Sequence, residues 1–184
     1  MHIDPITGLL DTATQAPSPN CDARPADCAI DLLVIHAISL PAGEFGGRWI
    51  DDLFCNRLEA DAHPDFADIC RLRVSAHALI RRDGEIVQYV PFGQRAWHAG
   101  ESRFQGRTAC NDFSIGIELE GCDDQAFEDI QYQRLAQLTR TLMQTYPGIT
   151  GERITGHSDI APGRKTDPGP HFDWRRLRQL LSSG

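Results

Sequence analysis

The sequence lacks an excess of basic residues, a long apolar run and closely paired cysteines. Its 18 Lys and Arg residues are outnumbered by 26 Asp and Glu residues, which gives a formal net charge of −8. Proteins that bind nucleic acids usually carry a basic patch, so we expect no nucleic-acid partner. A helix that spans a bilayer needs roughly 20 apolar residues in a row. No stretch approaches that length, so we expect no membrane partner either.

The features of an exported protein are also missing. The first residues, MHIDPITGLLDTATQ, contain no basic segment, no apolar core and no small-residue cleavage site of the kind found in signal peptides. The six cysteines form no CxxC pair and are expected to be reduced thiols rather than a disulfide framework. They are Cys21, Cys28, Cys55, Cys70, Cys110 and Cys122. We therefore expect a cytoplasmic protein, and a leaderless form of an exported protein is the alternative.

The composition that is present fits one globular domain. The chain has 184 residues, of which 41% are hydrophobic and 24% are charged. Residues 1–29 are rich in proline, aspartate and asparagine, and we expect an irregular N-terminal lead-in packed on the domain. Residues 30–184 are expected to form the domain itself.

Several segments have the periodicity of strands. Residues 30–35 are mostly apolar, which is typical of a strand buried on both faces. Residues 73–92 predict a hairpin, with Asp83 and Gly84 as a two-residue turn. Residues 113–120 alternate strictly, with one apolar face and one face of serine, glycine and glutamate.

Other segments have the periodicity of helices. Residues 49–58 and 131–146 place their apolar residues on one face of a helix, and Asp173 can cap a last helix. Residues 95–112 show no period and are expected to form a loop. Together these elements predict an α/β fold, a single domain with a central mixed β-sheet flanked by helices. A doubly wound fold is less consistent, because hairpins outnumber strand-helix-strand units.

Two histidines and an aspartate could carry chemistry. His36 ends the first apolar run, and His157 and Asp167 lie in the stretch GHSDIAPGRKTDPGP. Each alone is also typical of an ordinary role, as a histidine capped by backbone groups or a turn residue. Together they match the imidazole and carboxylate ligands of a catalytic zinc site, and the prolines would hold the loop rigid. Spacing alone does not choose between Asp159 and Asp167.

Glu118 and Lys165 are further candidates. Glu118 lies on the polar face of its predicted strand, beside Ser114 and Gly116, whose small size leaves space next to the carboxylate. The alternative is a solvent-facing glutamate, which is what we expect of Glu120 on the same face. Lys165 stands between the two proposed loop ligands, although a lysine there could also be an ordinary surface residue.

Five separated stretches resemble a known family. They are LLVIHAISLPAGEFGG, LRVSAHALIRRDGEIVQYVPF, RAWHAG, CNDFSIGIELEG and TGHSDIAPGRKTDPGPHFDW, which run from about residue 30 to residue 175. In this order they are similar to the zinc amidases related to peptidoglycan recognition proteins and certain phage amidases. The resemblance is to the cytoplasmic members that act on 1,6-anhydro-N-acetylmuramyl peptides in bacterial cell-wall recycling. It implies the amidase fold and one Zn²⁺ per chain.

The resemblance also assigns residues. It implies that His36, His157 and Asp167 bind zinc, that Glu118 is the catalytic acid/base and that Lys165 is a catalytic lysine. Asp159 then becomes a structural residue. The implied reaction is hydrolysis of the amide between the lactyl group of 1,6-anhydro-N-acetylmuramic acid and L-alanine, with the anhydromuramyl peptide as small-molecule substrate and no obligate protein partner.

The expected substrate contacts come from the same resemblance. Arg73 and Arg107 match arginines of the cleft, and arginine binds carboxylates with two hydrogen bonds. Trp97 is placed to stack on a sugar, with packing in the core as the alternative, and His77 is expected to line the cleft or to lie behind the metal ligands. Ala37 departs from the family, which usually has asparagine there, so substrate affinity is expected to differ. Ser158 replaces a frequent cysteine.

Two other functions remain open on the sequence alone. One is a recognition module that binds muropeptides without cutting them, although all five matched zinc-binding and catalytic residues are kept. The other is an amidase that acts on polymeric peptidoglycan.

Overall fold

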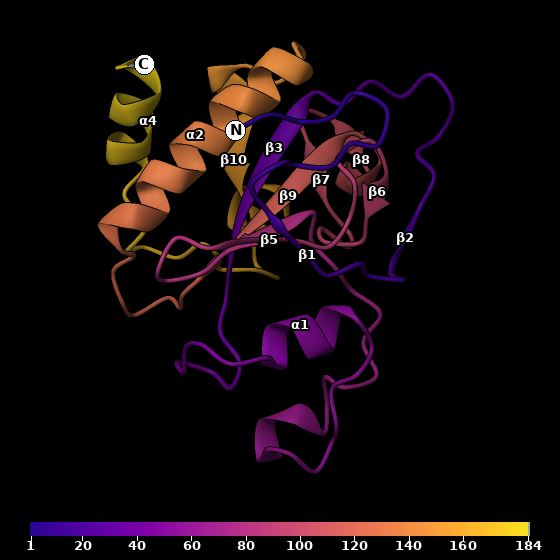
Figure 1. The fold of residues 1–184 in the computed structure, drawn as a ribbon, viewed down its shortest axis with the longest axis vertical. Coiled ribbons are helices and arrows are strands. Elements are labelled where there is room, and N and C mark those ends of the chain that lie inside the picture. Colours follow the sequence, from indigo (N-terminus) through magenta and orange to yellow (C-terminus); the bar gives the residue numbers. More distant parts are fainter. Residues whose placement is uncertain (184) are drawn as a thin grey trace.

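A central mixed sheet organises the molecule. The structure, a computed structural model, describes residues 1–183, in which six strands follow the order β1-β5-β4-β9-β3-β10 (Figure 1). Strands β4 and β5 pair antiparallel, and the other neighbours are parallel. The strands are β1 (Thr14–Gln15), β5 (Ile86–Gln88), β4 (Ala78–Ile80), β9 (Ser114–Glu120), β3 (Leu32–Ile38) and β10 (Ile154–Gly156). The predicted fold class, a mixed sheet flanked by helices, is confirmed.

The two longest strands, β9 and β3, are neighbours in the interior of the sheet. β3 and β9 run parallel in a register that pairs Leu32 with Ser114 and His36 with Glu118. Because side chains alternate between the faces of a strand, residues 36 and 118 project from the same face. All of β9 and the first five residues of β3 are buried. This register brings two of the predicted functional residues together.

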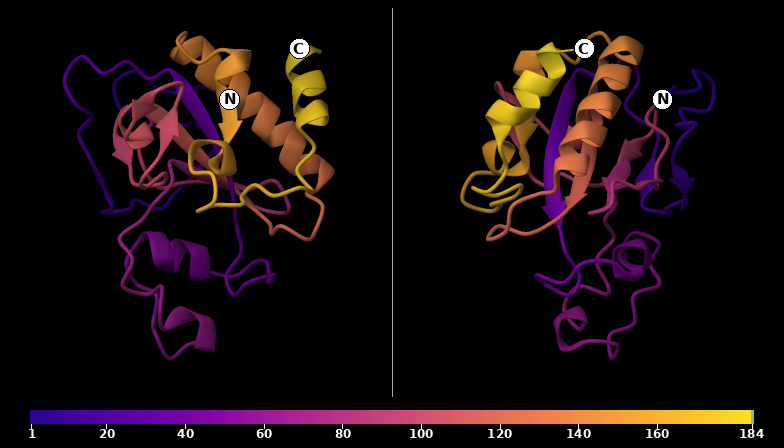
Figure 2. Two further views of the ribbon diagram at one scale, coloured as in Figure 1. Left: turned by 180° about the vertical axis from the view of Figure 1, so that it is seen from behind. Right: turned by 60° about the vertical axis from the view of Figure 1, so that its left-hand side comes forward.

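One face of the sheet is covered by two helices. Helices α2 (Asp129–Thr145) and α4 (Trp174–Ser182) pack side by side on it (Figure 2). Their apolar residues join Ile35, Ile115 and Ile117 in the main core cluster. The carboxylate of Asp173 accepts a hydrogen bond from the Arg176 N–H at 2.9 Å, so the predicted cap of the last helix is confirmed.

Short elements cover the opposite face. They are β2 (Cys21–Asp22), which pairs with β6 (Arg95–Ala96), β7 (Arg103–Phe104), which pairs with β8 (Arg107–Thr108), the 3₁₀ turn η2 (Cys110–Asp112), and helix α3 (His157–Ile160). A small apolar cluster that includes Phe104 of β7, Cys110 of η2 and Ile160 of α3 packs these three elements on Leu32 and Val34 of β3. Residues 95–112, expected as a loop, therefore form short strands and one turn.

The remaining elements lie at the edges of the sheet. Helix α1 (Trp49–Phe54) and the 3₁₀ turn η1 (Pro64–Phe66) extend below it (Figure 1), and the 3₁₀ turn η3 (Gly151–Arg153) precedes β10. A second apolar cluster joins α1 and η1 to β4 and β5. Among the described residues no helix has the length and apolar character needed to cross a membrane. The six cysteines, which all lie in this range, are free thiols.

Four sequence expectations need correction. Residues 1–29 contribute the short strands β1 and β2 instead of being wholly irregular. The hairpin turn has three residues, 82–84, because the Gly84 N–H bonds to the Arg81 carbonyl at 2.9 Å and Gly84 has a φ of +85°. The loop after β10 contains one helical turn, α3. Glu120 is 2% exposed, since its carboxylate accepts hydrogen bonds from the backbone of Gly46 and Arg82.

Candidate functional site

His36, His157 and Asp167 meet at the ends of β3 and β10. One donor atom from each lies within 4.8 Å of the other two. The Nδ1 atoms of the two histidines are 3.0 Å apart, and Oδ2 of Asp167 is 3.1 Å from each of them. Both histidines are buried and the aspartate is partly buried. The structure thus gathers three atoms of the kinds that bind zinc.

The local fold explains how the loop reaches this point. β10 pairs with β3 so that Gly156 lies opposite Ile35, which places the next residue, His157, beside His36. The carboxylate of Asp159 accepts hydrogen bonds from the Gly156 N–H and the Thr155 hydroxyl, both at 2.9 Å, and so fixes the start of α3. Asp159 therefore stabilises the turn, in agreement with the structural role that the resemblance implied for it.

A second contact closes the loop. The Ser158 N–H donates to the Asp167 carbonyl at 2.9 Å, which returns the chain to the first turn of α3. Gly156 permits this approach, because a methyl group there would lie 2.9 Å from Cδ of Pro168. The ten-residue separation of His157 and Asp167 is thus bridged by backbone contacts as well as by proline stiffness.

The hydrogen bonds around His36 determine which ring nitrogen carries a proton. The Ser114 hydroxyl donates to the Cys110 carbonyl at 2.6 Å, so its oxygen accepts from Nε2–H of His98 at 3.0 Å. Nδ1 of His98 is then free to accept from Nε2–H of His36 at 2.9 Å. His36 is left with an unprotonated Nδ1 that faces His157 and Asp167.

The same reasoning applies to His157. Its Nε2–H donates to the Ala99 carbonyl at 3.2 Å, which leaves Nδ1 as a lone pair. Two imidazole lone pairs and a carboxylate oxygen therefore converge with no proton between them, an arrangement that a cation would stabilise. Burial lowers the pKa of His36 to about 4, against the opposing effect of Asp167, so the ring stays neutral, as a ligand must be. The donor set fits a zinc ion.

Glu118 lies beside this cluster on the next strand. Its side chain is buried, and Oε2 has no hydrogen-bond partner. Burial raises the pKa of Glu118 well above its usual range and Asp167 adds to the effect, while the charge of Lys165 opposes it. A buried carboxyl whose pKa is raised is suited to acid/base chemistry. Lys165 itself is exposed on the loop between the proposed ligands.

The residues predicted to touch substrate lie in different environments. Arg73 is exposed, and its guanidinium bonds to the carbonyls of Arg71 and Leu72. Arg107 instead forms an ion pair with Asp31 at 2.7 Å and covers the ring of Phe113. The structure does not bring these two arginines into the cluster of donor atoms.

Three further predicted residues are placed by the fold. Trp97 is half-buried, and its indole N–H donates to Asp22 at 3.2 Å. His77 is 0% exposed and lies next to His98, with the two ring centroids 5.8 Å apart, which corresponds to the position behind the predicted metal ligands. Its Nδ1 accepts from the Gly116 N–H at 3.0 Å and its Nε2 lies 3.1 Å from the Gln94 carbonyl. Ala37 packs against the main apolar core, on the face of β3 opposite His36.

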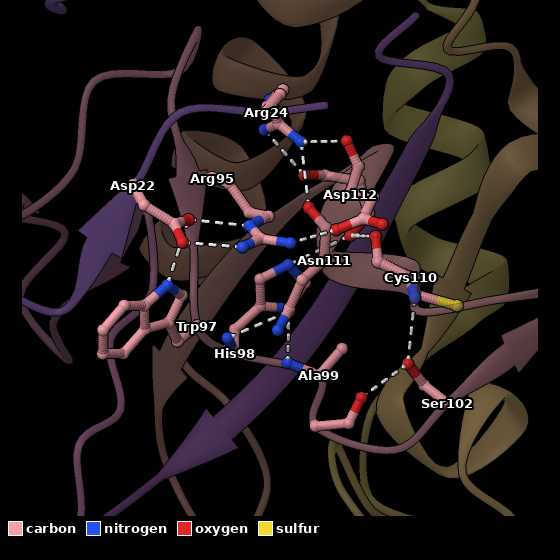
Figure 3. Close-up of polar contacts among 12 residues, drawn as sticks. Asp22, Arg24, Arg95, Trp97, His98, Ala99, Ser102, Cys110, Asn111 and Asp112 are labelled. Atoms are coloured by element: carbon pink, nitrogen blue, oxygen red, sulfur yellow. Dashed lines mark hydrogen bonds and ion pairs between the residues drawn. The ribbon is translucent and has the colours of Figure 1, made fainter. Parts of the chain in front are cut away.

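Sequence reasoning missed the network behind the two histidines. Figure 3 shows Asn111, whose side-chain oxygen accepts hydrogen bonds from the N–H groups of His98 and Ala99. In the same view Arg95 bridges Asp22 and Asp112. The RAWHAG resemblance marked this segment as a cleft border, but no pattern in the sequence pairs it with residue 111.

Arg24, from the N-terminal segment, holds the same network from behind. Its guanidinium donates to the backbone carbonyls of Asn111 and Asp112, both at 3.0 Å, and to those of Phe92 and Ser114 at 3.3 and 2.9 Å. One side chain thus holds the last two residues of the turn η2 together with Ser114, the first residue of β9.

Comparisons with known proteins identify the family. Residues 26–170 match the family described as N-acetylmuramoyl-L-alanine amidase. The chain is 63% identical over 178 residues to the 1,6-anhydro-N-acetylmuramyl-L-alanine amidase AmpD of Salmonella typhimurium strain SL1344, covering 97% of this chain and 95% of that protein.

Solved structures give the same result. A crystal structure of a selenomethionine derivative of AmpD superposes with a TM-score of 0.95 at 61% identity, covering 98% of this chain and 99% of the other. The Escherichia coli amidase AmiD, in complex with anhydro-N-acetylmuramic acid-L-Ala-D-γ-Glu-L-Lys, gives a TM-score of 0.61 at 35% identity, covering 85% and 60%. The chain therefore belongs to the N-acetylmuramoyl-L-alanine amidase family, as its motifs predicted, and it is a hydrolase.

Proposed function

We propose that the chain is a zinc-dependent 1,6-anhydro-N-acetylmuramyl-L-alanine amidase of cell-wall recycling. It hydrolyses the amide between the lactyl group of the anhydro-sugar and L-alanine of the stem peptide. The observation that carries the proposal is the convergence of three unprotonated donor atoms, each within 4.8 Å of the others, beside the buried carboxyl of Glu118. High identity to relatives named for this reaction supports it.

His36, His157 and Asp167 would hold the zinc ion, one per chain. When bound there, zinc would act as a Lewis acid that polarises the amide carbonyl and lowers the pKa of a water molecule, so that the water can lose a proton and attack near neutral pH. The hydrogen bonds to His98 and Ala99 keep the two imidazoles in the ligating tautomer.

Glu118 handles the protons of the reaction. Its carboxyl is buried and Oε2 has no partner, so it is free to accept a proton from the attacking water. Because the pKa of Glu118 is raised by burial, the proton it takes is retained until the amine of L-alanine leaves, when the carboxyl donates it. The same group thus acts as base and then as acid.

Lys165 stabilises the charge that develops on the substrate. Its ammonium group affects the ionisation of both His36 and Glu118, so its charge reaches the site. As the carbonyl oxygen becomes an oxyanion, this fixed positive charge lowers the energy of the transition state.

Arg73 and Trp97 are the candidate contacts to substrate. Arg73 forms no ion pair within residues 1–183 and is exposed, so it can bind a carboxylate of the stem peptide. The indole of Trp97 is oriented by Asp22 and is half-buried, which leaves part of its ring for a sugar. Arg107 would have to leave Asp31 before it could bind substrate.

The proposal includes a location and a partner. The partner is the anhydromuramyl peptide, with no obligate protein. The location is the cytoplasm, where glutathione and thioredoxin would keep the six free thiols reduced.

The test is hydrolysis of 1,6-anhydro-N-acetylmuramyl-tripeptide by zinc-loaded protein, with products identified by mass spectrometry. We expect the free tripeptide and the anhydro-sugar, and no products from Asp167→Asn. Heat of binding in calorimetry with an intact substrate would instead identify a muropeptide-binding module. Faster release of peptide from intact sacculi than from the anhydro-muropeptide would identify an amidase of polymeric peptidoglycan.

A further inference from the structure

The outer hydrogen-bond partners of the two histidines are neighbours in the sequence. His36 donates from Nε2 to Nδ1 of His98 at 2.9 Å, and His157 donates from Nε2 to the Ala99 carbonyl at 3.2 Å. His36 and His157 come from different elements, β3 and α3. A single dipeptide therefore sets the orientation of both rings.

That dipeptide is held by one side chain. Oδ1 of Asn111 accepts hydrogen bonds from the backbone N–H groups of His98, at 3.1 Å, and of Ala99, at 2.8 Å (Figure 3). The amide oxygen thus uses both of its lone pairs. Asn111 is itself anchored, because its backbone carbonyl accepts from Arg24 at 3.0 Å.

Packing on β9 restricts the ring of His98 further. Gly116 has no side chain, and a methyl group there would lie 2.4 Å from the imidazole of His98. The Ser114 hydroxyl on the same strand receives Nε2–H of that ring. With its backbone held by Asn111 and its ring held by β9, His98 has one orientation available.

We infer that Asn111 is a positioning residue for the metal centre, which orients His36 through His98 and His157 through Ala99. The inference rests on the proposed function in one respect, that zinc is the ion bound there. Without Oδ1 of Asn111 the N–H groups of His98 and Ala99 lose their acceptor, and the backbone that carries the partners of both imidazoles is no longer held in place. Partners outside the ligand shell typically account for about 10- to 100-fold in metal affinity, and we expect an effect of that order.

Three variants separate this role from a general loss of structure. Asn111→Ala removes the shared acceptor. Asn111→Asp keeps a side-chain oxygen at the same place and therefore retains the shared acceptor. Gln133→Ala, on the exposed side of α2, changes an amide side chain far from the site and serves as the control.

The first measurement is the zinc dissociation constant of each variant, by competition with a chromophoric chelator. We expect Asn111→Ala to bind zinc about 10- to 100-fold more weakly than wild type, with Asn111→Asp and Gln133→Ala close to wild type. Equal affinity in Asn111→Ala and wild type overturns the inference. A wild type that binds no zinc overturns the metal site and the proposed function, which is a different outcome.

The second measurement needs no variant. Nitrogen-15 NMR of the metal-free wild type reports the tautomer of each histidine, and we expect a proton on Nε2 of His36, His98 and His157. A proton on Nδ1 of either ligand overturns the inference even if Asn111→Ala fails to fold. In a folded Asn111→Ala we expect mixed tautomers at His36 and His157, a change that a lower thermal stability alone would not produce.

Discussion

The two faces of β9 carry opposite kinds of residue. On one face Ile115, Ile117 and Leu119 pack in the apolar core under α2 and α4. On the other, Ser114 holds the ring of His98 and Glu118 keeps an unpartnered carboxyl oxygen. Burial of apolar side chains on the first face stabilises the fold. On the second face the buried, unpartnered carboxyl of Glu118 destabilises it, as is common for functional groups. A substitution should therefore affect folding on one face and reaction rate on the other.

The largest expected effect is on the polar face. Glu118→Gln preserves the shape of the side chain but removes the group that moves protons, so we expect kcat/KM to fall by about 10²- to 10⁴-fold. Metal analysis should find as much zinc as in wild type. A variant that holds zinc and keeps the wild-type rate would show that Glu118 is not the acid/base.

The apolar face should respond in the opposite way. Leu138 on α2 is 0% exposed in the main core, so Leu138→Ala should lower the free energy of unfolding by about 2–5 kcal/mol. Urea denaturation measures this loss. At a temperature where the variant stays folded, kcat/KM should match wild type, and a large loss of rate in folded protein would contradict the separation of the two faces.

Zinc binding at the polar face should also raise the stability of the fold. If the ion binds only the folded state, free zinc at a hundredfold excess over its dissociation constant raises the free energy of unfolding by about 2.7 kcal/mol. Thermal unfolding with zinc and with a chelator tests this, and Asp167→Asn is the control that should show no dependence on zinc. A wild-type melting temperature that is the same with and without zinc would argue against the proposed zinc site.

The smallest effect concerns pH in the metal-free protein. The ordinary pKa of Glu118 is 4.5, and burial together with Asp167 raises it well above that value in the folded state. Between the two pKa values the folded state binds more protons than the unfolded state, so the free energy of unfolding falls as pH rises. Glu118→Gln removes this penalty and should be the more stable protein at neutral pH, with the difference vanishing below about pH 4.5. Urea titrations across this range measure it, and a difference independent of pH would show that ionisation of Glu118 is not its cause.

The sequence predicted the two faces of β9 but not what covers the polar one. Strict alternation over residues 113–120 separated Ile117 from Glu118 without any structure, because the strand period is two. The same alternation wrongly suggested that Glu120 faces solvent. A periodic pattern contains no information about the backbone N–H groups of Gly46 and Arg82, which donate hydrogen bonds to the Glu120 carboxylate.

The candidate ligands were reached by a different route. The motif resemblance selected Asp167 over Asp159, and the hydrogen bonds of Asp159 to Thr155 and Gly156 now give a physical reason for that choice. Asn111 was not predicted, because its contacts cross from one loop segment to another and follow no period. Arg107 was matched by motif to the cleft, and an ion pair with a distant aspartate, Asp31, is something that only the fold reveals.

The hydrogen bonds of Arg24 to four backbone carbonyls matter for any truncation of the chain. A fragment cut to residues 26–170, the span of the family match, would lose this guanidinium and all of α4. The carbonyls of Asn111, Asp112, Phe92 and Ser114 would then lose their shared donor, and the turn that carries Asn111 would lose its anchor. We therefore expect that the smallest fragment to fold and remain active extends beyond residues 26–170 in both directions.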